Sequence, residues 1–66
     1  MTDQSCLDTC QVSFEKNVNR LNEVLLNALV QADGDEELER RAREKFARGL
    51  DFARRARDIC ISSCNS

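Results

Sequence analysis

Four cysteines are the residues of this 66-residue chain whose type and spacing could do chemistry. They form two C-x-x-x-C pairs, Cys6 with Cys10 and, much later in the chain, Cys60 with Cys64. Residues four apart lie on one face of a helix, one turn apart, so each pair presents two sulfurs in one direction. Two such pairs that faced each other would place four sulfurs in one small volume.

Three chemistries fit such a cluster. Two disulfides between helices, Cys6–Cys64 and Cys10–Cys60, would clasp the chain, whereas bridges within a helix fit poorly because their Cβ vectors run parallel. All four thiolates could instead bind a tetrahedral zinc ion, Cu(I) or an iron–sulfur cluster. Reversible thiol redox chemistry is the third, since the first turn of a helix favours the thiolate of a residue such as Cys6. We favour the disulfides.

The elements that must position these cysteines are two helices joined by the turn Asp33-Gly34-Asp35. Gly34 suits the left-handed position after a helix, and Asp35 suits the N-cap of the next one. We therefore expect one domain over residues 1–66, with helices at about 3–32 and 36–64 around the turn 33–35.

Each expected helix carries one apolar stripe with three-and-four spacing, which indicates one buried face per helix. The first stripe is Leu7, Cys10, Phe14, Val18, Leu21, Leu25, Ala28 and Ala32. The second stripe is Leu38, Ala42, Phe46, Gly49, Ala53, Ala56, Cys60 and Cys64. The sequence thus predicts an all-α fold, an antiparallel two-helix hairpin clasped by four cysteines at its open end.

The position of the turn also predicts the register of the hairpin. When the chain folds back at residue 35, facing residues have numbers that add up to about 70. Cys6 then faces Cys64 and Cys10 faces Cys60, although the position of the turn follows from Asp33-Gly34-Asp35 alone. The register and the disulfide interpretation therefore support each other.

The same register predicts how the side chains between the helices pack. It sets Phe14 against Ala56, and Leu21 against Gly49. Because glycine within a helix costs about 1 kcal/mol relative to alanine, we interpret Gly49 as making room for Leu21 and not as a hinge.

Composition limits the partners of the chain. Its net charge of −2 gives no general attraction to nucleic acid or anionic lipid. The second helix is rich in arginine, but an acid stands four residues before many of the bases, an order that stabilises a solvated helix. We therefore expect ion pairs, no nucleic-acid binding and no exposed stacking aromatic residues. The pairs are Glu36–Arg40, Glu37–Arg41, Glu39–Arg43, Glu44–Arg48 and Asp51–Arg55.

Several functional classes find no support in the sequence. Histidine is absent and there is no glycine-rich phosphate loop, so we do not expect an enzyme. The longest mostly apolar segment, Val24 to Val30, is too short to cross a membrane. We see no signal peptide, which predicts a cytoplasmic protein by default, or an oxidising compartment such as the mitochondrial intermembrane space if the disulfides form.

Apolar residues outside the two stripes predict a protein interface. A two-helix hairpin has no third layer to cover them, and exposed apolar patches are typical of interaction sites. We expect a homodimer that forms a four-helix bundle, with a client protein as the alternative partner. The predicted interface residues are Val12, Leu26, Leu29, Val30, Leu50 and Ile59, and Ile61 also flanks the second stripe.

The twin C-x-x-x-C arrangement, Cys6/Cys10 with Cys60/Cys64, resembles that of the small chaperones of the mitochondrial intermembrane space and of the plant α-hairpinins. It is similar more loosely to the twin C-x9-C proteins. The resemblance implies a helical hairpin with nested disulfides, first to fourth and second to third, although the 49 residues between the two pairs exceed the spacing in those families. We interpret the chain as a disulfide-stapled structural or protein-interaction module without a cofactor. The alternatives are a zinc or copper protein for storage, transfer or sensing, with all four cysteines as ligands, and a thiol-redox protein.

Overall fold

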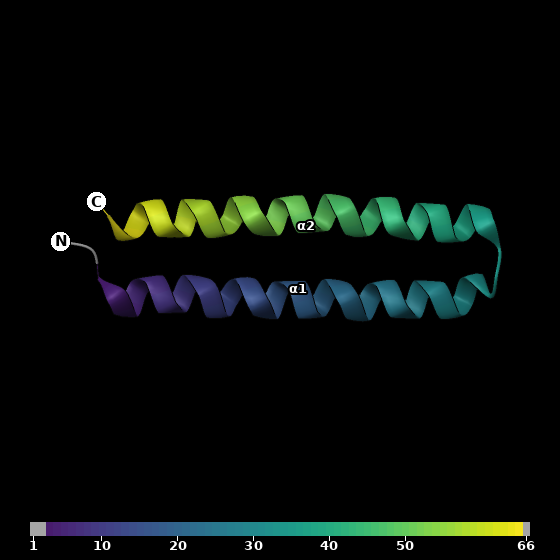
Figure 1. The fold of residues 1–66 in the computed structure, drawn as a ribbon, viewed down its shortest axis with the longest axis horizontal. Coiled ribbons are helices and arrows are strands. Elements are labelled where there is room, and N and C mark those ends of the chain that lie inside the picture. Colours follow the sequence, from purple (N-terminus) through teal and green to yellow (C-terminus); the bar gives the residue numbers. More distant parts are fainter. Residues whose placement is uncertain (1–2, 66) are drawn as a thin grey trace.

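The computed structural model describes residues 3–65, which form two antiparallel helices (Figure 1). Helix α1 spans Gln4–Ala32 and helix α2 spans Glu36–Cys64, each with 29 residues. The start of α1 and the end of α2 lie side by side at one end of the molecule, and the turn lies at the other. The predicted all-α hairpin is confirmed.

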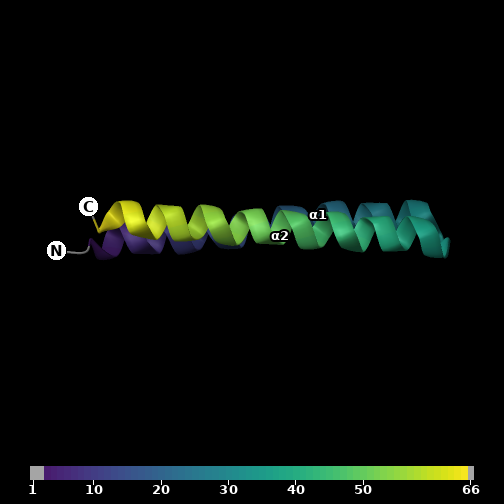
Figure 2. The ribbon, with the colours of Figure 1, turned by 90° about the horizontal axis from the view of Figure 1, so that it is seen from above.

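The hairpin is a long, flat molecule. Its extents are 51 × 14 × 7 Å and its radius of gyration is 15.3 Å, against about 11 Å for a globular chain of this length. Viewed edge-on, α1 and α2 overlap and cross at a shallow angle (Figure 2). Among the described residues each helix therefore has a single neighbour, and two broad faces are left uncovered.

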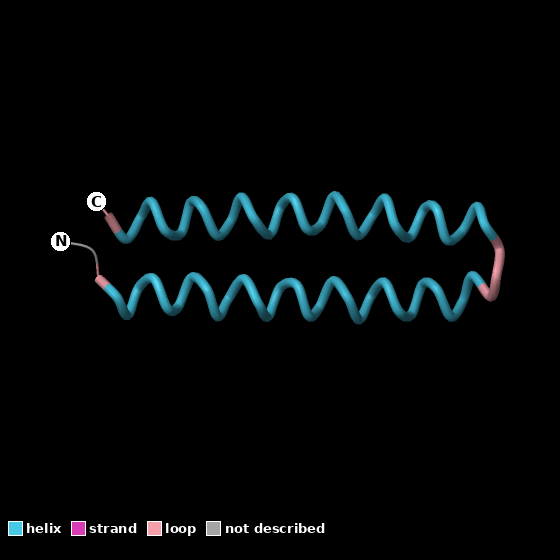
Figure 3. The backbone as a smooth tube through the Cα atoms, in the orientation of Figure 1, coloured by secondary structure: helices cyan, strands magenta, loops and turns pink. Residues whose placement is uncertain are grey.

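A short turn joins the two helices (Figure 3), and two consecutive residues of this turn have left-handed backbone conformations. Gly34 has a φ of 87°, as expected, and Asp33 joins it with a φ of 47°. The backbone N–H of Asp33 donates to the Leu29 carbonyl at 3.2 Å, which closes α1. Aspartate is one of the few residues other than glycine that tolerate this region, so a short connection can reverse the chain.

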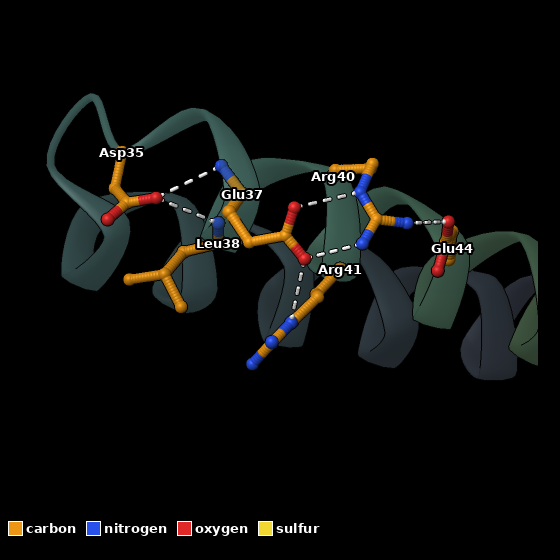
Figure 4. Close-up of polar contacts among 6 residues, drawn as sticks. All are labelled: Asp35, Glu37, Leu38, Arg40, Arg41 and Glu44. Atoms are coloured by element: carbon orange, nitrogen blue, oxygen red, sulfur yellow. Dashed lines mark hydrogen bonds and ion pairs between the residues drawn. The ribbon is translucent and has the colours of Figure 1, made fainter.

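Helix α2 begins with the N-cap that the sequence predicts. The Asp35 carboxylate accepts hydrogen bonds from the backbone N–H groups of Glu37 at 3.0 Å and Leu38 at 3.1 Å (Figure 4). These N–H groups have no partner within the helix, so the cap satisfies them. Asp3 caps α1 in the same way by accepting from the N–H of Ser5 at 3.0 Å.

The hairpin has almost no interior. In the described part of the chain no leucine, isoleucine, valine or phenylalanine side chain is buried. The large apolar residues of both stripes are half-buried or exposed. The four buried residues are Cys10, Ala32, Ala42 and Ala53.

Packing between the helices follows the predicted register at Gly49. A Cβ atom added to Gly49 would lie 2.5 Å from Leu21 Cδ2, so this glycine does make room for Leu21. At Phe14 the structure adds a contact that the register did not predict: the Arg57 guanidinium lies 4.5 Å from the centroid of the ring.

The ion pairs of α2 form only in part. Glu37 pairs with Arg41 at 3.2 Å, as predicted, and the Asp51–Arg55 pair forms at 3.1 Å. Arg40 does not pair with Glu36 but instead contacts both Glu37 and Glu44 (Figure 4). The other two predicted pairs, Glu39–Arg43 and Glu44–Arg48, are not among the ion pairs within residues 3–65.

Candidate functional site

The four cysteines form two disulfides at the open end of the hairpin. Cys6 is bonded to Cys64 and Cys10 to Cys60, with Cα–Cα distances of 5.9 and 5.7 Å. Both distances lie within the usual range of roughly 4.4–6.8 Å for a bridge. The first and second cysteines thus join the fourth and third, the pairing that register and resemblance both indicate.

The two bridges lie against each other. The sulfurs of Cys10 and Cys64, which belong to different disulfides, are 3.7 Å apart. Neither sulfur carries a proton, so this is a van der Waals contact and not a hydrogen bond. Cys10 is 1% exposed, which makes the inner bridge the more protected of the two.

Three of the four sulfurs are close enough to share a ligand. Those of Cys6, Cys10 and Cys64 all lie within 4.8 Å of one another. Cys60, predicted as the fourth metal ligand, is bonded to Cys10 but does not belong to this set.

The apolar residues predicted for an interface are exposed or half-buried, but they do not form one patch. By helical spacing, Val12, Leu26 and Val30 lie on the side of α1 turned away from α2, with Val30 68% exposed. Ile59 is 67% exposed on α2. Leu29 and Leu50 are half-buried on one broad side of the hairpin, which we call the leucine face. We define this face, by helical spacing, by its half-buried residues Val18, Leu29, Leu50 and Ile61.

One exposed aromatic residue was missed by the sequence analysis. Phe52 is 64% exposed, and the Arg55 guanidinium lies 5.5 Å from the centroid of its ring. The expectation that no aromatic residue is exposed is therefore wrong. Phe52 falls outside the apolar stripe of α2, and that position was the signal that could have revealed it.

The charged cluster at the start of α2 is a second polar feature of the surface. Arg40 donates a hydrogen bond to Glu37, and this bond is the main reason that the pKa of Glu37 lies below its ordinary value of 4.5. The hydrogen bond to Glu37 likewise raises the pKa of Arg40 above its ordinary value, and the charge of Glu44 adds to that effect. These residues are exposed and mutually paired, so the cluster stabilises the helix start and offers no chemically reactive group.

Within residues 3–65, neither helix is apolar over a long enough stretch to cross a membrane. Comparison of the chain with models of protein families, with curated proteins and with solved structures finds no significant match.

Proposed function

We propose that the chain is a disulfide-clasped protein-interaction module that works as a homodimer, in which two hairpins pack as a four-helix bundle. One observation carries the proposal: residues 3–65 bury no leucine, isoleucine, valine or phenylalanine side chain. A domain this small is stable only if it removes large apolar side chains from water or gains a staple. The disulfides supply the staple, and a second hairpin would supply the missing layer.

The leucine face is the surface that we propose for dimerisation. Its leucines are already half-buried, so a second copy would complete their burial at a gain of about 25 cal/mol for each Å² of apolar area. Val12 and Val30 lie on another side of α1 and would remain outside this contact. The clasp would hold the two helices in a fixed relation and so reduce the entropy lost on association.

Sedimentation velocity at micromolar concentration tests the dimer. The unchanged chain should sediment at twice its 7.5 kDa mass, and Leu50→Glu should produce the monomer because it buries an unpaired charge in the contact. Val30→Glu is the matched control, because it places the same charge at a position that is 68% exposed and outside the proposed contact. A monomer of the unchanged chain over the whole micromolar range would refute the proposal.

Metal binding by the reduced chain is the second candidate, because three sulfurs lie within 4.8 Å of one another. After a dithiol reduces both bridges, the thiolates of Cys6, Cys10 and Cys64 could bind zinc with Zn–S distances of about 2.3 Å. Native mass spectrometry of the reduced chain with zinc tests this. Cys64→Ser should lose the ion whereas Cys60→Ser should retain it, and a reduced chain that holds no zinc would rule the candidate out.

A further inference from the structure

A groove runs along the broad side of the hairpin opposite the leucine face. Three adjoining hollows form it. The first and second hollows share Leu21, and the first and third share Ala28 and Ala42. The groove extends from Asn17 to Ala32 along α1, or ~23 Å at 1.5 Å per residue. That length matches a partner helix of about four turns.

The groove has three large apolar side chains that remain partly exposed. Val24 is 47% exposed, Leu38 is 43% exposed and Phe52 is 64% exposed, and all three line it. Two of the hollows have volumes of about 320 and 340 Å³, enough to admit large side chains. Apolar residues of a helix with three-and-four spacing would fit such a row of hollows.

The charge of the groove is opposite to that of the molecule. Arg20, Arg41 and Lys45 line it, and no aspartate or glutamate does, although the whole chain has a net charge of −2. Arg41 is paired with Glu37. Within residues 3–65, neither Arg20 nor Lys45 takes part in an ion pair.

We infer that this groove binds an acidic amphipathic helix of a partner protein, whose apolar residues enter the hollows and whose carboxylates pair with Arg20, Arg41 and Lys45. The inference rests on the proposed role as an interaction module and names the partner of a second face. The bound helix would pack against α1 and α2 as a third helix of each hairpin.

Two other occupants fit the groove less well. A second copy of the chain packed through the same face would bring Arg20, Arg41 and Lys45 against like charges, which disfavours association. A fatty acid carries one carboxylate at one end, whereas the three cations are spread along the groove from Arg20 to Arg41. Carboxylates distributed along a helix match that spread.

The test uses a fluorescein-labelled peptide of about 16 residues, with leucine at three-and-four spacing flanked by glutamate, and a matched peptide with lysine in place of glutamate. Fluorescence anisotropy should show binding of the glutamate peptide about tenfold or more tighter than the lysine peptide, and weaker at high salt. Phe52→Ala should weaken binding about tenfold, and Lys45→Glu should weaken it about threefold or more.

Matched control variants lie outside the groove. Val30→Ala truncates an equally exposed apolar residue, and Lys16→Glu reverses the chain's other lysine; both should leave the affinity within about twofold. Equal binding of the two peptides, no binding at millimolar peptide, or equal losses in the controls would overturn the inference. Displacement of the peptide by oleate, independent of Lys45→Glu, would do the same.

Sedimentation of these variants separates this inference from the proposed dimer. We expect Phe52→Ala and Lys45→Glu to remain dimeric while they lose the peptide, and Leu50→Glu to become monomeric while it still binds the peptide. If Phe52→Ala instead abolished the dimer, the groove would be the contact between two copies and the inference would fail. If only the peptide result failed, the dimer proposal would stand.

Discussion

At the scale of single residues, the contact between Gly49 and Leu21 decides how closely the two helices approach. In an isolated helix Gly49→Ala would stabilise by about 1 kcal/mol. Here the new Cβ would lie 2.5 Å from Leu21 Cδ2, and the overpacking should cost about 1–3 kcal/mol. We expect Gly49→Ala to lower the free energy of unfolding by about 1 kcal/mol, as measured in urea.

The control for this prediction is the same substitution in a chain that carries Leu21→Ala. With the leucine removed, nothing opposes the gain in helix propensity, so Gly49→Ala should raise the free energy of unfolding by about 1 kcal/mol. An identical effect in both backgrounds would show that the close contact has no energetic consequence.

Arg57 illustrates a residue whose role the sequence did not reveal. Its side chain is 31% exposed, and its guanidinium covers the face of the half-buried Phe14 ring. Such a cation–π contact is worth about 0.5–2 kcal/mol, more as it loses water. In the sequence Arg57 looks like one member of a charged, solvated run, because neither composition nor spacing distinguishes it from Arg54 or Arg55.

At the scale of elements, the start of α2 is an electrostatic unit that should respond to acid. The pKa of Glu37 is held below its ordinary value of 4.5, chiefly by the hydrogen bond from Arg40 and further by Arg41. The ionised form of Glu37 is therefore more stable, relative to the protonated form, in the folded helix than in the unfolded chain. This stabilisation is complete above pH 4.5 and is lost as the pH falls through the lower folded pKa.

An NMR titration of the Glu37 side chain measures this effect. The midpoint should lie below pH 4.5 in the unchanged chain and should rise in Arg40→Gln, which removes the main donor. Arg54→Gln, which alters an arginine about 25 Å further along α2 that does not act on Glu37, should leave the midpoint unchanged. A midpoint that Arg40→Gln does not move would contradict the assignment of cause.

The elements themselves were predictable because their signals are local. Asp33-Gly34-Asp35 places the turn and the cap of α2, and periodic apolar residues indicate the helices. The position of the turn also sets the register, that is, which residues of the two helices lie at the same level. The pairing of the cysteines therefore followed from the sequence as well. The rotation of each helix does not follow, because a change of one residue turns the side chain by about 100°. That limit explains why the Arg57 contact with Phe14 and the exposure of Phe52 were not predicted.

At the scale of the whole molecule, the two ends of the hairpin are held by different means. The turn is held by covalent continuity and by the Asp35 cap, whereas the open end, 51 Å away at most, has only the disulfides to join the helices covalently. Half-buried side chains alone connect the helices between these ends. The two disulfides, which we call the clasp, therefore control whether α1 and α2 stay in their relative positions. Both proposed contacts, on the leucine face and in the groove, require these positions.

The outer bridge offers the clearest test of the clasp. With Cys10–Cys60 intact, Cys6–Cys64 closes a further loop of only about ten residues, so its removal should cost about 3 kcal/mol in the chain-entropy model. Cys6→Ser combined with Cys64→Ser should lower the free energy of unfolding by that amount. Removal of both bridges should cost more than removal of either, because the loops of 50 and 58 residues are then fully open.

Amide hydrogen exchange distinguishes a local from a global role of the clasp. If the clasp acts on the whole molecule, loss of both bridges should raise exchange throughout α1 and α2, because the few half-buried contacts between the helices cannot hold them alone. The dimer should weaken in parallel. Faster exchange confined to the ends near Cys10 and Cys60 would instead show that the central contacts suffice, and that the disulfides only prevent fraying.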